Sequence, residues 1–241
     1  MDAVITAGGR VGSPLCEIIG TTVKALAGIG SQTMLEHAIT SARAVGAERI
    51  AVVGGDEVRQ QCGALVDRVI PEHSSGAENV RRALAAFEGD IVYLSSDLPF
   101  INGSALGEFL NRVPPATIAM PLADAAAYES RFPNAPAHAT VIGGERVANG
   151  SAFFIPAGAA TRIAEVSQQF FDARKSLLRM ATLLGPQLLF KFALRRLRIA
   201  DIERRASAIL GFSTSAIRDC APELCYDVDD LRDYEYACEH G

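Results

Sequence analysis

The sequence has few cysteines and none with metal-ligand spacing. The five cysteines are an odd number and lack a Cys-x-x-Cys motif: Cys16, Cys62, Cys220, Cys225 and Cys238. In a chain of 241 residues this usage argues against a disulfide framework and indicates reduced thiols, as in a cytoplasmic protein. The closest pair, Cys220 and Cys225, has no His ligand nearby, so we predict no zinc site.

Long hydrophobic runs are also missing. A membrane-spanning helix needs roughly 18 to 20 apolar residues, and no stretch reaches that length. The nearest, residues 180–199, is broken by Gly185-Pro186 and carries four basic residues: Lys191, Arg195, Arg196 and Arg198. For this segment, 180–199, we expect a buried or dimer-facing helix, with a membrane-surface helix as the alternative. The role of its part Leu183 to Ile199 is not identified by the sequence. The N-terminus has no basic region and no long apolar region, so we expect no signal peptide.

The sequence has no excess of positive charge. Its formal net charge is -5, which gives no electrostatic attraction toward nucleic-acid phosphates, so we predict no nucleic-acid partner. The hydrophobic share of 49% and charged share of 21% are typical of a soluble globular enzyme. Without repeats, low-complexity tracts or linkers, residues 1–241 are predicted to form one domain.

In the first hundred residues, short apolar runs typical of strands alternate with segments whose apolar residues have helical spacing. We predict strands at 3–6, 50–53, 66–70 and 91–94, and helices at 33–45, 57–65 and 77–87. Thr33, with Glu36 three residues later, has the capping-box pattern. The strands are apolar on both faces, as in parallel strands buried between helices. This order predicts an α/β fold with a doubly wound, mostly parallel sheet.

The regular alternation of predicted strands and helices ends near residue 100. We expect a helix at 105–110, a strand at 117–120, and then an irregular polar insertion at 121–136. Strands at 139–142 and 151–155 should flank a turn at 143–150. Helices should dominate from residue 157, followed by a strand at 214–217 and a final helix starting near Asp229. The second half is therefore predicted to be an elaborated, largely helical addition.

The first strand runs into the glycine pair Ala7-Gly8-Gly9. Adjacent glycines let backbone N–H groups point inward and hold phosphate oxygens. A dinucleotide-binding G-x-G-x-x-G loop is excluded, because the first two glycines are adjacent and no helix is expected before Thr33. The loop from Arg10 to Thr33 is long enough to indicate a functional role.

The fourth strand ends in Ser95-Ser96-Asp97-Leu98-Pro99. A carboxylate just beyond a buried strand is well placed as a Mg²⁺ ligand. The other explanation, a helix cap, fits poorly because the next helix is expected only near Asn102. Asp97 is therefore the firmest single candidate.

Together these segments resemble the MobA-like NTP transferase (nucleotidyltransferase) family, related to molybdenum cofactor guanylyltransferase and the sugar-phosphate nucleotidyltransferases. The similar segments are the glycine loop, Lys24-Ala25-Leu26, Met34 to His37, Ser75 to Asn79, Asp97-Leu98-Pro99, and Asp227-Val228-Asp229 with Asp233. The resemblance implies a Rossmann-like, nucleotide-diphospho-sugar-transferase type of fold. It also implies a nucleotide-binding half at 1–100 and an acceptor-binding and dimer or partner half at 101–241.

The resemblance implies a Mg²⁺-dependent attack by a phosphorylated small-molecule acceptor on the α-phosphate of a nucleoside triphosphate, with release of pyrophosphate. Lys24 and Asp97 would be catalytic, and Asp97, Asp227 and Asp229 would hold the metal. Asp229 could instead cap the last helix, which favours Asp227 as the ligand. The remaining nucleotide-binding residues would be Ala7, Gly8, Gly9, Arg10, Ser75, Gly76 and Asn79. The acceptor would contact Asn149, Gly150, Arg174 and Lys175.

Two other hypotheses stay open. The same fold could serve a glycosyltransferase that uses a nucleotide-sugar, although Ser95-Ser96-Asp97 lacks the first carboxylate of an Asp-x-Asp motif. The chain could also be a non-catalytic nucleotide-binding module, since its glycine loop departs from the family pattern. In this chain the loop from the glycines to Lys24 is longer than in the family, and no proline follows Lys24. The residues identify neither the base nor the acceptor.

Overall fold

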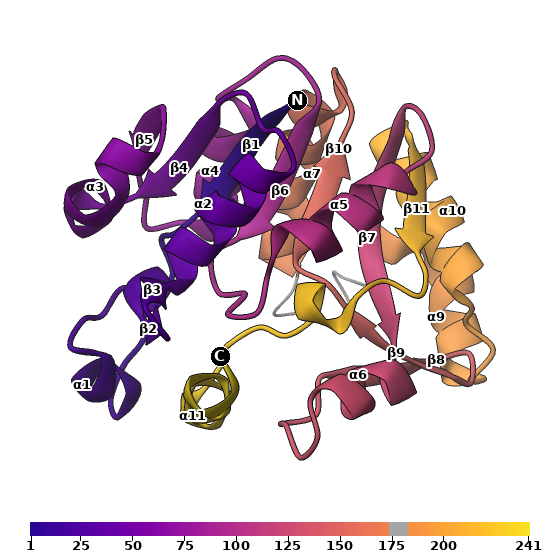
Figure 1. Ribbon diagram of the computed structural model, residues 1–241. Helices are drawn as coiled ribbons and strands as arrows, with labels where there is room; N and C mark the ends of the chain where they lie inside the picture. The colour runs from indigo at the N-terminus through magenta and orange to yellow at the C-terminus, as the bar shows by residue number, and fades with distance from the viewer. Residues whose placement is uncertain (174–182) are drawn as a thin grey trace.

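A computed structural model describes residues 1–173 and 183–241. Its main feature is a nine-stranded sheet with the order β5-β4-β1-β6-β10-β7-β9-β8, in which β11 also pairs with β7 (Figure 1). The strands are β1 (Asp2–Thr6), β4 (Ile50–Gly54), β5 (Arg68–Pro71), β6 (Ile91–Ser95), β7 (Thr117–Asp124), β8 (Ala139–Ile142), β9 (Glu145–Asn149), β10 (Ala152–Ile155) and β11 (Ser213–Ile217).

The first four strands of this sheet pair in parallel, as the sequence predicts. β1 lies between β4 and β6, and β4 pairs with β5. Successive side chains of β1 point to opposite faces, so that Ile5 joins one apolar core and Val4 the other. Because both faces are buried, β1, β4 and β6 are apolar at nearly every position, whereas the edge strand β5 is partly exposed. The doubly wound α/β fold is confirmed.

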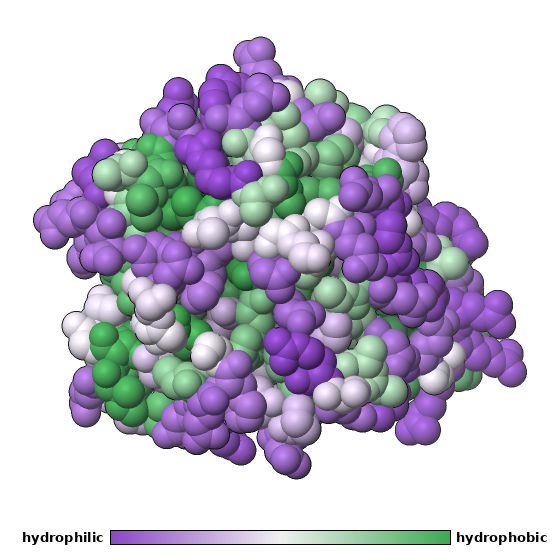
Figure 2. Space-filling model, in the orientation of Figure 1, coloured by the Kyte–Doolittle hydropathy of each residue, from purple (hydrophilic) through white to green (hydrophobic). Residues whose placement is uncertain are grey.

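Helices cover both faces of the sheet. On the face of Ile5 lie α2 (Met34–Ala44), α5 (Gly103–Asn111) and α11 (Leu231–His240). On the face of Val4 lie α4 (Gly76–Leu84), α7 (Ala159–Ala173) and α10 (Ile199–Leu210). Figure 1 shows α2 and α5 together in front of the sheet. Polar side chains dominate the surface seen from this side, with apolar residues in separate patches (Figure 2).

The second half of the sheet is mixed in direction. β10 runs antiparallel between β6 and β7, whereas β11 is parallel to β7. The expected irregular insertion at 121–136 is wrong, because β7 continues through Pro121 to Asp124 and α6 (Ala125–Arg131) follows. The expected turn at 143–150 is also wrong, since it contains β9, paired with both β7 and β8. Only Gly143 and Gly144 turn, both with positive φ.

The long loop after β1 contains regular structure that the sequence analysis does not predict. It includes the short helix α1 (Leu15–Ile19), the helical turn η1 (Lys24–Leu26) and a hairpin of β2 (Gly28–Ile29) and β3 (Gln32–Thr33). Two further short turns are η2 (Gly63–Leu65) and η3 (Pro222–Leu224), and α3 (Asp56–Cys62) follows β4. The elements of the loop are too short for periodicity to identify.

The apolar and basic segment near residue 190 forms α9 (Pro186–Ala193). No residue of α9 is buried, so the expectation of a buried helix is wrong, while the dimer-facing and membrane-surface helices stay predictions. Among the described residues, no helix is long and apolar enough to cross a membrane.

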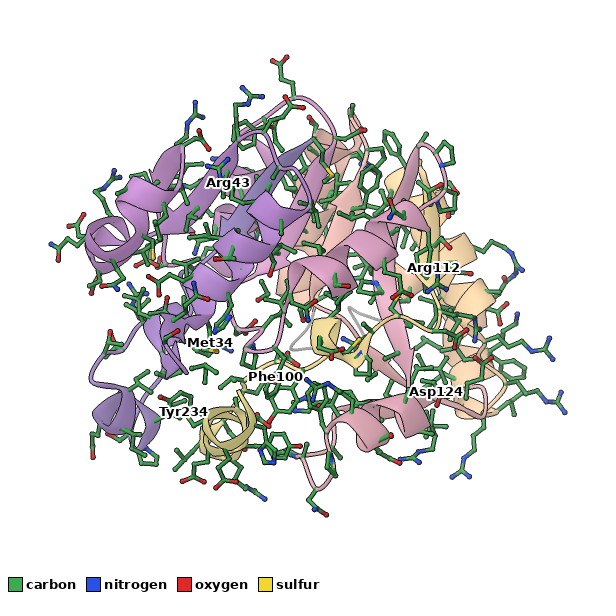
Figure 3. The ribbon with its side chains drawn as sticks, viewed as in Figure 1. Met34, Arg43, Phe100, Arg112, Asp124 and Tyr234 are labelled. Atoms are coloured by element: carbon green, nitrogen blue, oxygen red, sulfur yellow. The ribbon has the colours of Figure 1, made fainter. Side chains whose placement is uncertain are left out.

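The C-terminal segment crosses the Ile5 face and packs there through aromatic side chains. The ring of Phe100, labelled in Figure 3, stacks on Phe132 with centroids 4.8 Å apart and meets Tyr226 edge-on at 5.0 Å. Tyr226 is fully buried, and its hydroxyl donates to the Asp233 carbonyl at 3.0 Å. These contacts fix the chain on both sides of the acidic segment at 227–230.

The predicted capping box of α2 is confirmed and gives a test of the local fold. Thr33 Oγ1 accepts a hydrogen bond from the Glu36 amide at 3.2 Å, and Glu36 Oε2 accepts one from the Thr33 amide at 2.6 Å. Thr33→Ala should lower the free energy of unfolding by about 1 kcal/mol, measured by urea denaturation. Thr40→Ala, at an exposed position of the same helix, should cause no loss. Equal stabilities of Thr33→Ala and Thr40→Ala would contradict the capping role.

Candidate active site

A pocket of about 740 Å³ opens beyond the carboxyl ends of β1 and β6. This is where ligands bind in open parallel sheets, since loops from neighbouring strands diverge there. It brings together residues from four segments of the chain: Thr6, Gly8, Gly9, Arg10, Lys24, Glu72, Gly76, Asn79, Tyr93 and Asp97.

The long loop between Gly9 and Lys24 does not move Lys24 away from the glycine pair. The two ends of this loop are joined by a β-bridge between Arg10 and Val23. A hydrogen bond from the Val11 amide to the Thr22 carbonyl at 2.9 Å also joins them. The Lys24 amide then donates to the Gly9 carbonyl at 3.0 Å. The longer loop therefore returns the lysine directly to the glycine pair.

The Lys24 ammonium group joins three distant segments. Its Nζ lies 2.5 Å from Asp97 Oδ2, 3.6 Å from Asp229 Oδ1, and donates to the Val228 carbonyl at 2.7 Å. The Val228 amide in turn donates to the Asp97 carbonyl at 3.0 Å. The C-terminal segment is thus held on the end of β6 by one lysine and one backbone hydrogen bond.

Asp97 owes its place to the end of β6 and not to helix capping. Ser95 Oγ donates to Asp97 Oδ1 at 2.5 Å, which fixes one carboxylate oxygen while Lys24 holds the other. The N-cap of α5 is Asn102, whose Oδ1 accepts from the Ala105 amide at 2.9 Å. The sequence-based argument against a capping role for Asp97 is confirmed.

The aspartates of the acidic segment at 227–230 have different contacts and exposures. Asp230 caps α11, with Oδ1 accepting from the Arg232 amide at 2.8 Å. The alternative that Asp229 caps this helix is therefore wrong, and the helix begins at Leu231. Asp229 is largely exposed and lies near Lys24. Asp227 is more enclosed, with Oδ1 at 3.5 Å from His138 Nδ1.

The charges in this cluster shift one another's pKa values. Burial favours a lower pKa for Lys24, but the negative charges of Asp97, Asp229 and Asp227 outweigh it and raise the pKa. Lys24 therefore keeps its positive charge at neutral pH. Burial, with the charges of Asp229 and Asp97, raises the pKa of Asp227 to about 6. The cluster thus carries more negative charge than the lysine balances.

Close packing explains the glycine at position 8. A Cβ atom there would lie 2.7 Å from Glu72 Oε2 and 2.9 Å from Asn79 Nδ2. Glu72 also forms an ion pair with Arg10 across the pocket mouth. The absence of a side chain at Gly8 lets these groups and the backbone approach one another.

The segment leading into α4 is ordered by Asn79. Its Nδ2 donates to the His73 carbonyl at 2.9 Å, and its Oδ1 accepts from the His73 amide at 2.6 Å. Ser74 and Gly76, on either side of Ser75, line the pocket at the N-terminus of α4. The positive end of that helix dipole therefore faces the cavity.

Comparison with known proteins identifies the family. The family model of the MobA-like NTP transferase domain matches residues 3–201. The chain belongs to the MobA-like NTP transferase family. A curated relative, the bifunctional protein GlmU of Corynebacterium jeikeium (strain K411), is 30% identical over an alignment of 102 residues, and the match covers 36% of this chain and 21% of that protein. The matched part of the chain thus spans about a fifth of that relative's length.

Solved structures share the fold over nearly the whole chain. A hypothetical transferase from Thermus thermophilus is 26% identical, with a TM-score of 0.85, covering 97% of this chain and 98% of its own. CMP:2-keto-3-deoxy-manno-octonic acid synthetase complexed with CTP is 16% identical, with a TM-score of 0.57 and coverages of 99% and 96%. Rv0371c from Mycobacterium tuberculosis H37Rv, in complex with manganese, is 17% identical, with a TM-score of 0.54 and coverages of 100% and 98%.

The proposed acceptor residues lie apart from this pocket lining. Asn149 is exposed at the end of β9, and Gly150 is buried. A Cβ at Gly150 would lie 2.5 Å from Pro121 Cγ and 2.7 Å from the Leu224 carbonyl oxygen, so close packing explains this glycine. Arg174 and Lys175 lie outside the described residues. Among those described, no group of three or more His, Cys, Asp or Glu residues is arranged to hold a metal ion.

Several residues at the site are not predicted by sequence reasoning. Tyr93 lies within an apolar strand and gives no signal, yet its hydroxyl shares a hydrogen bond with Thr6 Oγ1 at 2.7 Å. Glu72 follows β5 at a strand end, which is a usable signal. His138 Nε2 lies 3.1 Å from Asp233 Oδ1, and this hydrogen bond raises the pKa of His138. Ala7, in contrast, is among the residues predicted to bind the nucleotide, and it is fully buried beside the glycines.

Asn79→Ala tests the order of the pocket wall. The substitution leaves the amide and carbonyl of His73 without their partners, so we expect a loss of about 1–3 kcal/mol in the free energy of unfolding. Urea denaturation measures the loss, and Asn111→Ala, at an exposed position at the end of α5, is the control. Unchanged stability of Asn79→Ala would show that the amide does not hold this segment.

Proposed function

We propose that the chain is a nucleotidyltransferase that transfers a nucleoside monophosphate from a nucleoside triphosphate to a phosphorylated acceptor. The observation that carries the proposal is the placement of Lys24. Its charged Nζ lies between Asp97 and Asp229, and its backbone amide is bonded to Gly9 at the floor of the nucleotide-sized pocket. Residues 1–100 would bind the nucleotide, and residues 101–241 would bind the acceptor.

In the proposed reaction an acceptor phosphate oxygen attacks the α-phosphorus, and the bond to the β-phosphate oxygen breaks to release pyrophosphate. Such chemistry depends on positioning and on charge neutralisation more than on covalent catalysis. The amides of Gly8 and Gly9 and the N-terminus of α4 would hold phosphate oxygens, because free N–H groups and the helix dipole both favour anions. Arg10 would bind the same phosphates after leaving Glu72.

Lys24 acts in this proposal as a fixed positive charge. The surrounding carboxylates raise its pKa, so it would not serve as a proton acceptor at neutral pH. An ammonium group next to the α-phosphate stabilises the negative charge that develops in the transition state and on the leaving pyrophosphate.

The described residues form no complete protein cage for a metal ion, but the carboxylates beside Lys24 would suit a Mg²⁺ ion that substrate phosphates also bind. Asp97, Asp227 and Asp229 supply hard oxygen donors, and their mutual repulsion contributes to the raised pKa of Asp227. Mg²⁺ is usually held by one or two carboxylates together with substrate phosphates and water, so a complete protein cage is not required. Asp97 and Asp227 would hold the ion, with Asp229 beside them. When bound, Mg²⁺ would neutralise charge on the phosphates.

Substitution of the two central residues tests the proposal. Lys24→Ala and Asp97→Ala should each lower the rate of pyrophosphate release by about 10²–10³ or more. The first removes the positive charge beside the reacting phosphate, and the second removes a carboxylate that would hold Mg²⁺. The assay supplies the four nucleoside triphosphates with Mg²⁺ and a panel of phosphorylated acceptors. Circular dichroism of each variant should match that of the unchanged protein.

Arg43→Ala is the matched control. It breaks an ion pair to Asp67 of 2.8 Å that lies outside the pocket, and it should leave the rate unchanged. Wild-type rates from Lys24→Ala or Asp97→Ala would refute the assignment. Release of nucleoside diphosphate from a nucleotide-sugar would instead indicate a glycosyltransferase, and nucleotide binding without Mg²⁺ dependence or turnover would indicate a non-catalytic module.

A further inference from the structure

A second cavity, of about 580 Å³, lies on the Val4 face of the sheet, between its strands and helices α4, α7 and α10. Its size is within the range of roughly 300–1,000 Å³ that is usual for small-molecule sites. The side chains on its wall are mainly aliphatic and aromatic, among them Leu84, Ile118, Met120, Phe153, Ile163 and Leu210. Since apolar cavities do not hold ordered water, an apolar ligand is the suitable occupant.

Two polar side chains on the wall, those of Glu203 and Thr214, are already bonded to the protein. Glu203 Oε1 accepts a hydrogen bond from the Ala216 amide at 2.8 Å. Thr214 Oγ1 donates to the Glu203 carbonyl at 2.7 Å. These groups brace α10 against β11, so what the wall offers to a ligand is hydrocarbon surface.

The cavity and the nucleotide pocket share a wall. Tyr93 and Val80 line both. The Tyr93 hydroxyl reaches Thr6 on the nucleotide side, whereas its ring packs edge-on against Phe153, a residue of the apolar cavity, with centroids 6.0 Å apart. An amphiphilic molecule in the cavity would therefore have its polar end beside the nucleotide phosphates.

Helix α9 presents a surface of matching character next to the cavity. Phe190 and Phe192 are 67% and 68% exposed, and Leu189 and Leu194 are also exposed. Basic residues alternate with them and continue to the start of α10: Lys191, Arg195, Arg196 and Arg198. Ile142 and Ile199 of the cavity wall are adjacent in sequence to Gly143 and Arg198, which line the hollow beside this basic cluster. Figure 1 shows α9 and α10 together at the edge of the molecule, beside β8 and β11.

We propose that the acceptor is a phosphorylated lipid whose hydrocarbon chain occupies the apolar cavity, and that α9 lies on the anionic bilayer from which this lipid comes. The inference rests on the proposed nucleotidyl transfer and names its acceptor class. The lipid phosphate oxygen would form the new bond to the α-phosphorus as pyrophosphate leaves.

The basic cluster directly after α9, formed by Arg195, Arg196 and Arg198, indicates the bilayer as its partner. Lys191, the basic residue within α9, is paired with Asp201 at 2.6 Å. Exposed phenylalanine and leucine side chains next to lysine and arginine are the composition with which helices bind anionic lipid surfaces, the apolar groups entering the acyl boundary. In a symmetric dimer formed through α9, the basic clusters of the two copies would face each other and repel. Formation of such a dimer is an outcome that the vesicle test below distinguishes from bilayer binding.

A chain-length series tests the cavity without depending on turnover. Calorimetry measures binding of hexyl, octyl and decyl phosphate, each below its micelle concentration and without nucleotide. Each added methylene should strengthen binding about fourfold, because about 0.8 kcal/mol accompanies burial of each CH₂ group. Affinities that do not rise from hexyl to decyl phosphate would overturn the proposal.

A cavity-filling variant locates the chain. Ala206 of α10 lines the cavity, and Ala206→Phe should abolish the dependence on chain length. Ala208→Phe, at an exposed position on the same helix, should keep it. A chain-length dependence that is unchanged in a folded Ala206→Phe variant would place the alkyl chain elsewhere and overturn the proposal.

These results separate the acceptor class from the reaction. Rising affinity without pyrophosphate release would support the lipid site while refuting nucleotidyl transfer. Nucleotidyl transfer to glycerol phosphate as fast as to decyl phosphate, with flat affinities, would retain the reaction and refute the lipid acceptor.

Vesicle sedimentation tests α9. The protein should bind phosphatidylglycerol vesicles more tightly than phosphatidylcholine vesicles, and added salt should weaken the binding. Replacing Phe190 and Phe192 together by Ser should weaken it about tenfold or more. Leu65→Ser, which removes a similarly exposed apolar residue outside α9, should not. Equal binding to both lipids, or a dimer that the double variant dissociates, would overturn the bilayer assignment.

Discussion

The contact between the Lys24 ammonium group and the Asp97 carboxylate is the one on which the arrangement of this site depends. Lys24 lies in the long loop after β1 and Asp97 directly follows β6. The same ammonium group holds the Val228 carbonyl of the C-terminal segment. A buried or half-buried charge is stable only when it is paired and hydrogen-bonded. Lys24 therefore fixes where the glycine loop, the end of β6 and the acidic segment meet. A phosphate group or a metal ion that enters must share or replace these pairings.

The two faces of the sheet have different tasks in this account. The Ile5 face carries the aromatic cluster that holds the C-terminal segment in place, and with it Asp227 and Asp229. The Val4 face leaves an apolar cavity under α10 that touches the nucleotide pocket at Tyr93. The alternation of side chains along β1 and β6 is what allows one sheet to support both. The charged site and the apolar cavity thus meet at the side chains of Tyr93 and Val80.

Much of the first half of the fold could be predicted from the sequence, because buried parallel strands and an amphipathic helix with a capping box leave strong periodic signals. The strand ends then place Gly8, Gly9 and Asp97 at one edge. The second half could not be predicted as well. β7 runs through Pro121, and β9 is a polar strand with two buried residues, so neither shows the usual pattern. The contact of Lys24 with Val228 joins residues 204 apart and involves a carbonyl group that no side-chain pattern reveals. In the sequence Tyr93 is one residue of an apolar strand, with nothing to indicate a functional role. Its position between two cavities results from the packing of α4 and β10 and could not be predicted.

The fate of the α-phosphorus tests the central claim most directly. The protein would be incubated with Mg²⁺, an alkyl phosphate and a nucleoside triphosphate labelled at the α-phosphorus, and the products would be separated. The account predicts that the label appears in a new diphosphate linked to the acceptor, in an amount equal to the unlabelled pyrophosphate released. Label that remains in nucleoside diphosphate or in unreacted triphosphate, with no labelled acceptor for any of the four bases, would contradict it.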